Sequence, residues 1–223
     1  MIRKNLLFSK MLIIKTSSKF LFDRFMDSFV PEMETCPVCH CKGNCHIHAY
    51  YDRSIIDYIG DHKVKHSICV MRVMCDSCQH THAILPDHII PYGTHGLFFV
   101  LRVLAEHLCL HRTIAGICEK YDISEKLFYK WKSLFKLHKK LWLGKLKDLE
   151  TSLPAFIRKL LIEPFSKFSR DFISCFSFSF LQAHKNPQVT FKNTAGYCQK
   201  VFTPDYIGDW GLGIGDWGLG IGD

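Results

Sequence analysis

Two Cys-x-x-Cys pairs, Cys36-Pro-Val-Cys39 and Cys75-Asp-Ser-Cys78, are the residues of this chain best suited to chemistry. Each pair presents two thiolates from one tight turn, and two such turns complete the tetrahedron that zinc prefers. The spacing between the pairs leaves room for a strand, a turn and a second strand. The sequence therefore predicts a structural Zn²⁺ site with Cys36, Cys39, Cys75 and Cys78 as ligands, in a small module that depends on the metal to fold.

Two further cysteines leave the ligand set open. Cys41 and Cys45 follow the first pair closely, so a site drawn from that cluster alone is an alternative, as is an iron–sulfur cluster. The expected role for Cys41 and Cys45 is that of free thiols on a loop. Two complete pairs leave no open coordination position, which favours a structural site over a catalytic one.

Histidines also surround the two pairs. His40, His46 and His48 lie near the first pair and compete as ligands. His80 and His82 flank the second pair, where a surface position or a hydrogen bond to a ligand is the expected role.

Composition suggests the compartment and the class of partner. The formal charge of +8 and the pI near 8.9 suit a polyanionic partner. The chain has eleven cysteines, and an odd number cannot all pair in disulfides, which argues against a secreted disulfide framework. Lys10 and Lys15 interrupt the apolar residues Met11–Ile14, so no signal peptide is expected, and no apolar run is long enough to span a bilayer. We expect a cytoplasmic protein with no membrane partner.

The second feature is a helix-turn-helix pattern between Thr113 and Lys132. Apolar residues recur at helical spacing on both sides of a short turn, Asp122–Ser124, and Ile123 can fill the angle between the helices. Ser124 is a good N-cap for the second helix. Asp122 stands where such turns often have Gly, and Asp tolerates the left-handed conformation. The second helix of such a unit can enter the major groove of DNA.

The face of that second helix opposite its apolar residues is basic. Between Lys126 and Lys147 there are eight Lys and no Asp or Glu. Lysines can neutralise phosphates, while Tyr and Ser hydroxyls can hydrogen-bond to phosphates or base edges. The predicted DNA contacts are Lys126, Tyr129, Lys130, Lys132 and Ser133.

These patterns predict an α+β protein, mainly α, in which a zinc-ribbon β module precedes a helical domain. Strand character between the cysteine pairs, helical period from Leu97, and phenylalanines at helical spacing from Phe165 support this order. The tail repeats Gly-Asp-Trp-Gly-Leu-Gly-Ile, which a seven-nucleotide unit read through three frames encodes, so we expect disorder there and a native frame that ends or shifts near Asp205. The expected segments are a disordered or artefactual leader (1–35), the zinc ribbon (36–94), the helix-turn-helix domain (95–150), a helical Phe-rich extension (151–205) and the repeat tail (206–223).

Residues 36–182 resemble an uncharacterised bacterial zinc-ribbon and helix-turn-helix family related to the N-terminal regions of insertion-sequence transposases. The motifs that carry the resemblance are Cys36-Pro-x-Cys39, the segment from Arg72 to Pro86 around Cys75-x-x-Cys78, and Ile123 to Trp131. The resemblance implies a zinc ribbon joined to a DNA-binding domain that binds element ends, with the four cysteines as ligands and the exposed residues after Ser124 as DNA contacts. One departure is that His40 and Gln79 stand where zinc-knuckle turns often have Gly.

The sequence offers no convincing catalytic apparatus. A transposase needs a set of carboxylates that hold two metal ions, and the few acids after Lys147 do not form one. We therefore expect no catalysis by this chain. The function predicted is that of a zinc-containing DNA-binding protein of mobile-element origin, whose partners are DNA and a separate transposase or recombinase subunit. The alternatives are a zinc-ribbon protein-interaction module and a truncated transposase that lacks its catalytic domain.

Overall fold

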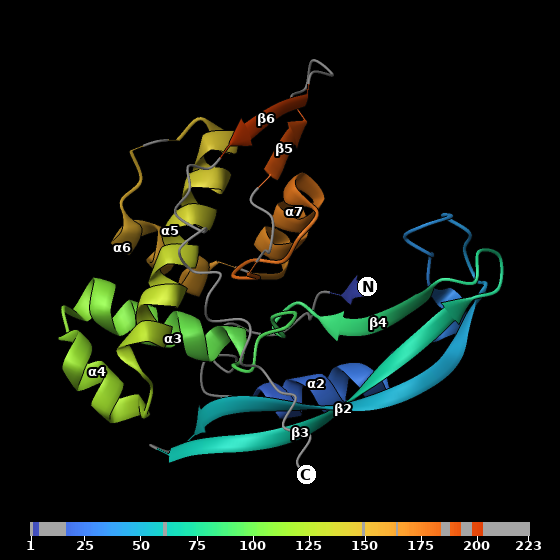
Figure 1. Ribbon diagram of the computed structural model, residues 1–223, viewed down its shortest axis with the longest axis horizontal. Helices are drawn as coiled ribbons and strands as arrows, with labels where there is room; N and C mark the ends of the chain where they lie inside the picture. Colours follow the sequence, from blue (N-terminus) through green and yellow to red (C-terminus); the bar gives the residue numbers. More distant parts are fainter. Residues whose placement is uncertain are drawn as a thin grey trace, which may run out of the picture. The chain divides into compact units, whose positions relative to one another are not determined.

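The computed structural model describes residues 2–4, 17–59, 62–148, 150–163, 165–183, 188–192 and 198–202. They divide into two compact units, Met1–Ala183 and His184–Asp223. The second unit contains an antiparallel pair of strands, β5 (Gln188–Lys192) and β6 (Cys198–Phe202). The first unit holds a four-stranded sheet followed by helices, which confirms the predicted α+β class (Figure 1). The repeat tail lies outside the described residues.

A long hairpin dominates the sheet, whose strand order is β1-β4-β3-β2. β2 (Cys45–Ile59) and β3 (His62–Cys75) pair antiparallel along their whole length, with one irregularity between Ile47 and Ala49. β4 (Thr81–Pro86) pairs only with the last part of β3, and β1 (Ile2–Lys4) runs parallel to β4. The hairpin therefore extends well beyond the rest of the sheet (Figure 1).

Helix α2 (Ser18–Asp27) and the short 3-10 helix η1 (Pro31–Met33) lie in the segment that the sequence assigned to a leader. Helix α2 packs against β2 and β3, buries Leu21, and places Phe25 and Phe22 in the two core clusters of the sheet. The buried face of α2 is thus part of the core of the module that holds the cysteines. Residues 5–16 lie outside the described part of the chain.

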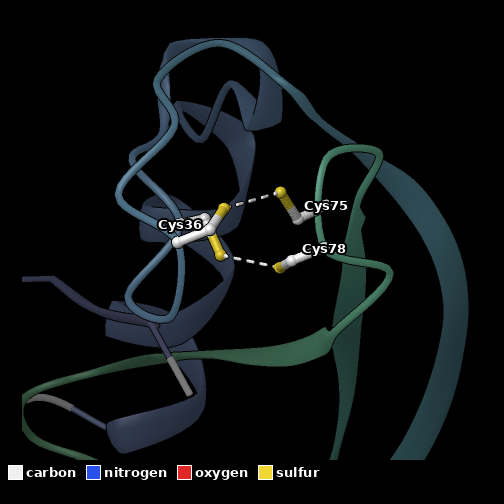
Figure 2. Close-up of side chains that lie close together, drawn as sticks. Cys36, Cys75 and Cys78 are labelled. Atoms are coloured by element: carbon white, nitrogen blue, oxygen red, sulfur yellow. Dashed lines mark hydrogen bonds between the residues drawn. The ribbon is translucent and has the colours of Figure 1, made fainter.

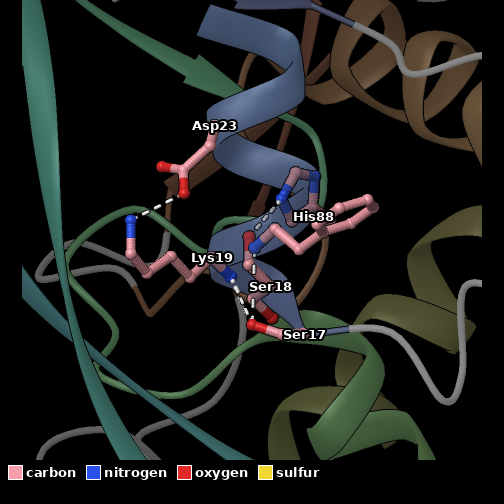
Figure 3. A network of polar contacts seen from close by, with 6 residues as sticks. Ser17, Ser18, Lys19, Asp23 and His88 are labelled. Atoms are coloured by element: carbon pink, nitrogen blue, oxygen red, sulfur yellow. Dashed lines mark hydrogen bonds and ion pairs between the residues drawn. The ribbon is translucent and has the colours of Figure 1, made fainter.

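Buried polar contacts attach the start of α2 to the hairpin and to the segment after β4. The Asp57 carboxylate accepts hydrogen bonds from the amide and the hydroxyl of Ser18, each at 2.7 Å. His88 Nε2 lies 3.2 Å from the Ser18 carbonyl oxygen (Figure 3). Ser17 caps the helix, with its hydroxyl accepting from the Lys19 amide (Figure 3). A negative carboxylate at a helix N-terminus is also favoured by the helix dipole.

Three helices follow the sheet: α3 (Leu97–Leu110), α4 (Ile114–Tyr121) and α5 (Glu125–Leu146). The Ser124 hydroxyl accepts from the Leu127 amide at 3.2 Å and caps α5, as the sequence predicted. Asp122 has the left-handed conformation, with φ of 47°, so the expected turn forms without Gly. The helices α4 and α5 thus form the two helical arms and short turn expected for a helix-turn-helix.

Helices α6 (Leu153–Ile162) and α7 (Phe165–Phe176) complete the first unit. The phenylalanines of α7 pack with aromatic residues of α5, including Trp142 and the fully buried His138. His138 Nδ1 accepts a hydrogen bond from the Leu181 amide at 2.9 Å. The Phe stripe of α7 is therefore core, as expected. In the described part of the chain, no helix has both the length and the apolar character needed to cross a bilayer.

Candidate metal centre and nucleic-acid interface

The two Cys-x-x-Cys turns, here called the knuckles, have the same backbone geometry. In the first, the Cys36 amide donates to the Cys41 carbonyl at 2.9 Å, and the His40 amide donates to the Cys36 carbonyl at 3.0 Å. In the second, the Cys75 amide donates to the His80 carbonyl at 3.1 Å, and the Gln79 amide donates to the Cys75 carbonyl at 2.8 Å. Because the two turns have the same hydrogen-bonding pattern, the two thiols of each pair have the same arrangement relative to the backbone in both knuckles.

The residue after each pair explains how the turns close without Gly. His40 and Gln79 both adopt the left-handed conformation, with φ of 62° and 58°. Glycine is favoured in this conformation because it has no Cβ, and for other residues the conformation costs about 1–2 kcal/mol of conformational free energy. The departure of the sequence from the usual Gly therefore leaves the knuckle geometry intact.

The four thiols of the knuckles converge on one point. The Sγ atoms of Cys36, Cys39, Cys75 and Cys78 all lie within 4.8 Å of one another. The Cys36–Cys78 distance is 3.6 Å (Figure 2). The Cys39–Cys75 distance is also 3.6 Å. A tetrahedron with Zn–S bonds of about 2.3 Å has edges of about 3.8 Å, whereas a disulfide requires about 2.05 Å. The arrangement fits four ligands around one ion and does not fit disulfides.

Hydrogen bonds from the knuckle amides favour the thiolate of the first cysteine in each pair. Burial raises the pKa of Cys36, but hydrogen bonds from the amides of Cys39 and Val38, together with those from His82 and Cys78, give a net lowering to about 5. Burial likewise raises the pKa of Cys75, and the Cys78 amide contributes to a net lowering. At Cys39 a backbone amide lowers the pKa, but burial and the three other thiols raise it more. At Cys78 a backbone amide also lowers the pKa, but burial and the thiols of Cys36 and Cys75 give a net increase. The thiolate is the form of cysteine that binds a metal.

Cys41 and Cys45 do not join this cluster. Within the described ranges, the four knuckle cysteines are the one group of metal-ligating side chains close enough to share an ion. Cys45 is buried and lies opposite Cys75 in the sheet; burial and the charges of Cys75 and Cys36 raise its pKa to about 11. Cys41 is half-buried and supplies a backbone carbonyl to the first knuckle.

The nearby histidines surround the cluster without entering it. His82 is 4% exposed, and its Nε2 lies 3.4 Å from Cys36 Sγ, which is the supporting contact foreseen for it. His46 pairs with Asp76 at 2.9 Å, and His80 Nδ1 lies 3.0 Å from the Cys78 carbonyl oxygen. His40 and His48 are exposed.

The predicted DNA-contacting residues occupy one exposed face of α5, with one exception. Lys126, Tyr129, Lys130 and Ser133 are exposed. Lys132 is half-buried at the flank of the helix, and its Nζ lies 2.9 Å from His107 Nε2 of α3. Burial, with a smaller effect of Lys136, lowers the pKa of Lys132. The structure therefore brings four of the five residues onto a common surface.

Sequence reasoning missed a seam between the β2–β3 hairpin and the helix-turn-helix. Lys63 Nζ donates to the Asp122 carboxylate at 2.8 Å and to its carbonyl at 2.9 Å. The rings of Tyr58 and Tyr121 meet edge to face, with centroids 4.7 Å apart, and Arg102 lies over both. These residues are too far apart in the sequence for any local pattern to pair them. The knuckles and the α4–α5 turn thus lie at opposite ends of one hairpin (Figure 1).

In the comparison with known proteins, one family model matches part of the chain. Residues 36–123 match the family described as Domain of unknown function (DUF6431). No curated protein and no solved structure matches this chain. The matched region begins at the first knuckle cysteine and ends in the turn before α5, so it contains both knuckles, the hairpin, α3 and α4.

Proposed function

We propose that this chain is a zinc-containing DNA-binding protein in which the knuckles hold one structural Zn²⁺ and α5 contacts duplex DNA. The observation that carries the proposal is the exposed basic face of α5, the capped second helix of the helix-turn-helix. The proposal is for a binding protein and not for an enzyme.

The donor set favours zinc. Four thiolates in a tetrahedral arrangement are typical of zinc or of iron–sulfur sites. Cys36, Cys45 and Cys75 belong to a buried apolar cluster with Phe25, Met71, Val73 and Ile84. A four-thiolate site with no open position, placed inside the core of a small module, is suited to folding the module.

The surface of α5 favours DNA as the partner. Its exposed lysines can neutralise phosphates, while the hydroxyls of Tyr129 and Ser133 are available for base edges or phosphates. At the turn, Lys63 pairs with Asp122 and compensates the charge of that carboxylate. A helix presented in this way after a short turn is the element that enters the major groove in helix-turn-helix proteins.

The test is a salt titration of binding to duplex DNA by fluorescence anisotropy. The variant carries Lys126→Glu and Lys130→Glu, both at exposed positions of α5. A control with Lys42→Glu and Lys167→Glu makes the same change in net charge at exposed positions outside α5. Because each phosphate contact contributes about 0.9 to the slope of log K against log salt, the first variant, which loses two contacts, loses about 1.8 units of slope. Equal binding by the two variants contradicts the proposal.

The proposed origin in a mobile element rests on the resemblance of the knuckle and helix-turn-helix motifs to N-terminal regions of transposases. On this proposal the DNA bound is the end of an element, and a separate recombinase subunit performs the chemistry. The measurement is the sequence of the flanking DNA. Terminal inverted repeats beside a recombinase frame support the origin, whereas their absence on both sides refutes it.

A second candidate function is a protein-docking module at the knuckle end of the hairpin. Its basis is a set of exposed apolar side chains there: Met33 is 72% exposed, Val38 is 50% exposed and Ile47 is 46% exposed. Exposed apolar side chains that cluster are typical of interaction surfaces. A folded, metal-loaded chain with no affinity for duplex DNA at low salt favours this function over the first.

A further inference from the structure

The end of the hairpin farthest from the knuckles is held against the start of α5 by the seam described above. Lys63 binds both the carboxylate and the carbonyl of Asp122, the residue that ends α4. Ser124, which caps α5, follows two positions later. Residues near Lys63 are therefore neighbours of the N-terminal turn of α5.

A second attachment fixes the same part of the hairpin. Ile56 exchanges backbone hydrogen bonds with the segment before α3, donating to Thr94 at 2.7 Å and accepting from Gly96 at 3.2 Å. His95, between those two residues, packs edge to face on Trp131 of α5, with ring centroids 5.0 Å apart. Two attachments, one to the turn and one to the helix, give the hairpin a defined position beside α5.

This position of the hairpin places Lys65 close to the N-terminal turn of α5. It lies opposite Ile56 in the sheet, two residues along β3 from Lys63, so both lysines project from the same side of the strand. Lys65 is exposed and makes no ion pair with another residue in the described part of the chain. Lys63, in contrast, is engaged with Asp122 and neutralises its charge.

We propose that the hairpin is a second DNA-contacting element, in which Lys65 binds a phosphate of the strand that borders the groove entered by α5. This inference rests on the proposed function. In helix-turn-helix proteins the N-terminal residues of the second helix reach the base edges, so an element docked beside that end faces the adjacent backbone. Lys63 contributes by removing the repulsion that the Asp122 carboxylate exerts on phosphate.

The experiment compares Lys65→Gln with Lys42→Gln in the full metal-loaded chain, using anisotropy with one duplex over a range of salt concentrations. Loss of one phosphate contact lowers the slope of log K against log salt by about 0.9, and affinity at 0.1 M salt falls about eightfold. Lys42→Gln, at an exposed position beside the knuckles, keeps the parental slope.

A second variant tests the role of Lys63 without removing it. Asp122→Asn keeps the left-handed turn, because Asn also tolerates that conformation, and frees Lys63 for a phosphate. The expected result is a slope about 0.9 larger than that of the parent. If Lys126→Glu with Lys130→Glu weakens binding but Lys65→Gln and Asp122→Asn both keep the parental slope, the inference about the hairpin is wrong and the proposed function stands. A parent chain with no DNA affinity overturns the proposed function and the inference together.

Discussion

Replacing Cys39 with Ser tests whether the knuckles hold one metal ion and whether that ion stabilises the fold. The substitution removes one of four sulfurs that lie within 4.8 Å of one another. Structural zinc sites contribute about 10–16 kcal/mol of apparent binding free energy at neutral pH, and whole domains are stable by only about 5–15 kcal/mol. Loss of tight binding at this site is therefore enough to unfold the module around it.

The matched control is Cys45→Ala. Cys45 is buried like Cys36 and Cys75, being 2% exposed, whereas Cys39 is half-buried; Cys45 lies opposite Cys75 in the sheet but stands outside the four-sulfur group. Removing its sulfur leaves a small cavity, with an expected cost of about 1 kcal/mol. Each variant thus removes one sulfur in or against the same core cluster, but only Cys39→Ser removes a proposed metal ligand.

The assay is metal content per chain after purification in zinc, together with urea unfolding in the presence and absence of a chelator. We expect one zinc per chain in the parent and in Cys45→Ala, and none bound tightly in Cys39→Ser. Chelator destabilises the first two proteins and leaves the third unchanged. One tightly bound zinc in Cys39→Ser, or its loss in Cys45→Ala, refutes the assigned ligand set.

Two further predictions concern stability. Burial, with the charge of Lys63, lowers the pKa of His95 to about 4, whereas the pKa in the unfolded chain is about 6.5. The unfolded chain therefore takes up a proton first as the pH falls. The free energy of unfolding is unaffected by His95 above pH 6.5 and decreases by up to about 3 kcal/mol as the pH falls to 4. His95→Phe keeps a ring there and should lose that part of the pH dependence in urea unfolding at pH 7.5 and 4.5; an unchanged difference between the two pH values contradicts this. A Cβ at Gly96 would meet Ser18 Oγ at 2.1 Å and Asp57 Oδ1 at 2.6 Å, so Gly96→Ala should destabilise the protein by about 1–3 kcal/mol in thermal unfolding. Gly144→Ala, in a helix with open space, is the control and should gain up to about 1 kcal/mol; equal effects of the two substitutions would be inconsistent with the close packing at Gly96.

Features that depend on a few neighbouring residues could be predicted from the sequence. The cysteine spacing defines each knuckle, and Ser124 defines the start of α5, because turns and caps are formed by hydrogen bonds within a few residues. The Phe stripe of α7 and the apolar period of α3 follow from helical spacing alone. The left-handed turns at His40, Gln79 and Asp122 form even though none of these residues is Gly.

Features that depend on distant residues could not be predicted in this way. The burial of α2 against the hairpin requires Asp57 to reach Ser18, which lies 39 residues earlier in the chain. Lys132 belongs to the basic run, yet its half-buried position follows from the packing of α5 on α3. A helical wheel places a residue on a face but does not say which neighbouring helix covers that face.

The sequence by itself determined the two pairs of thiols, the two helices and the turn between them, since each is specified by interactions along a short stretch of chain. Only the tertiary structure decided that Cys41 and Cys45 stand apart from the four converging sulfurs. It also decided that one hairpin connects the knuckles to the α4–α5 turn through Lys63 and Asp122. The physical reason is that these contacts are made by the pairing of β2 with β3 and by the docking of the hairpin on the helices, which bring together residues that no local spacing relates.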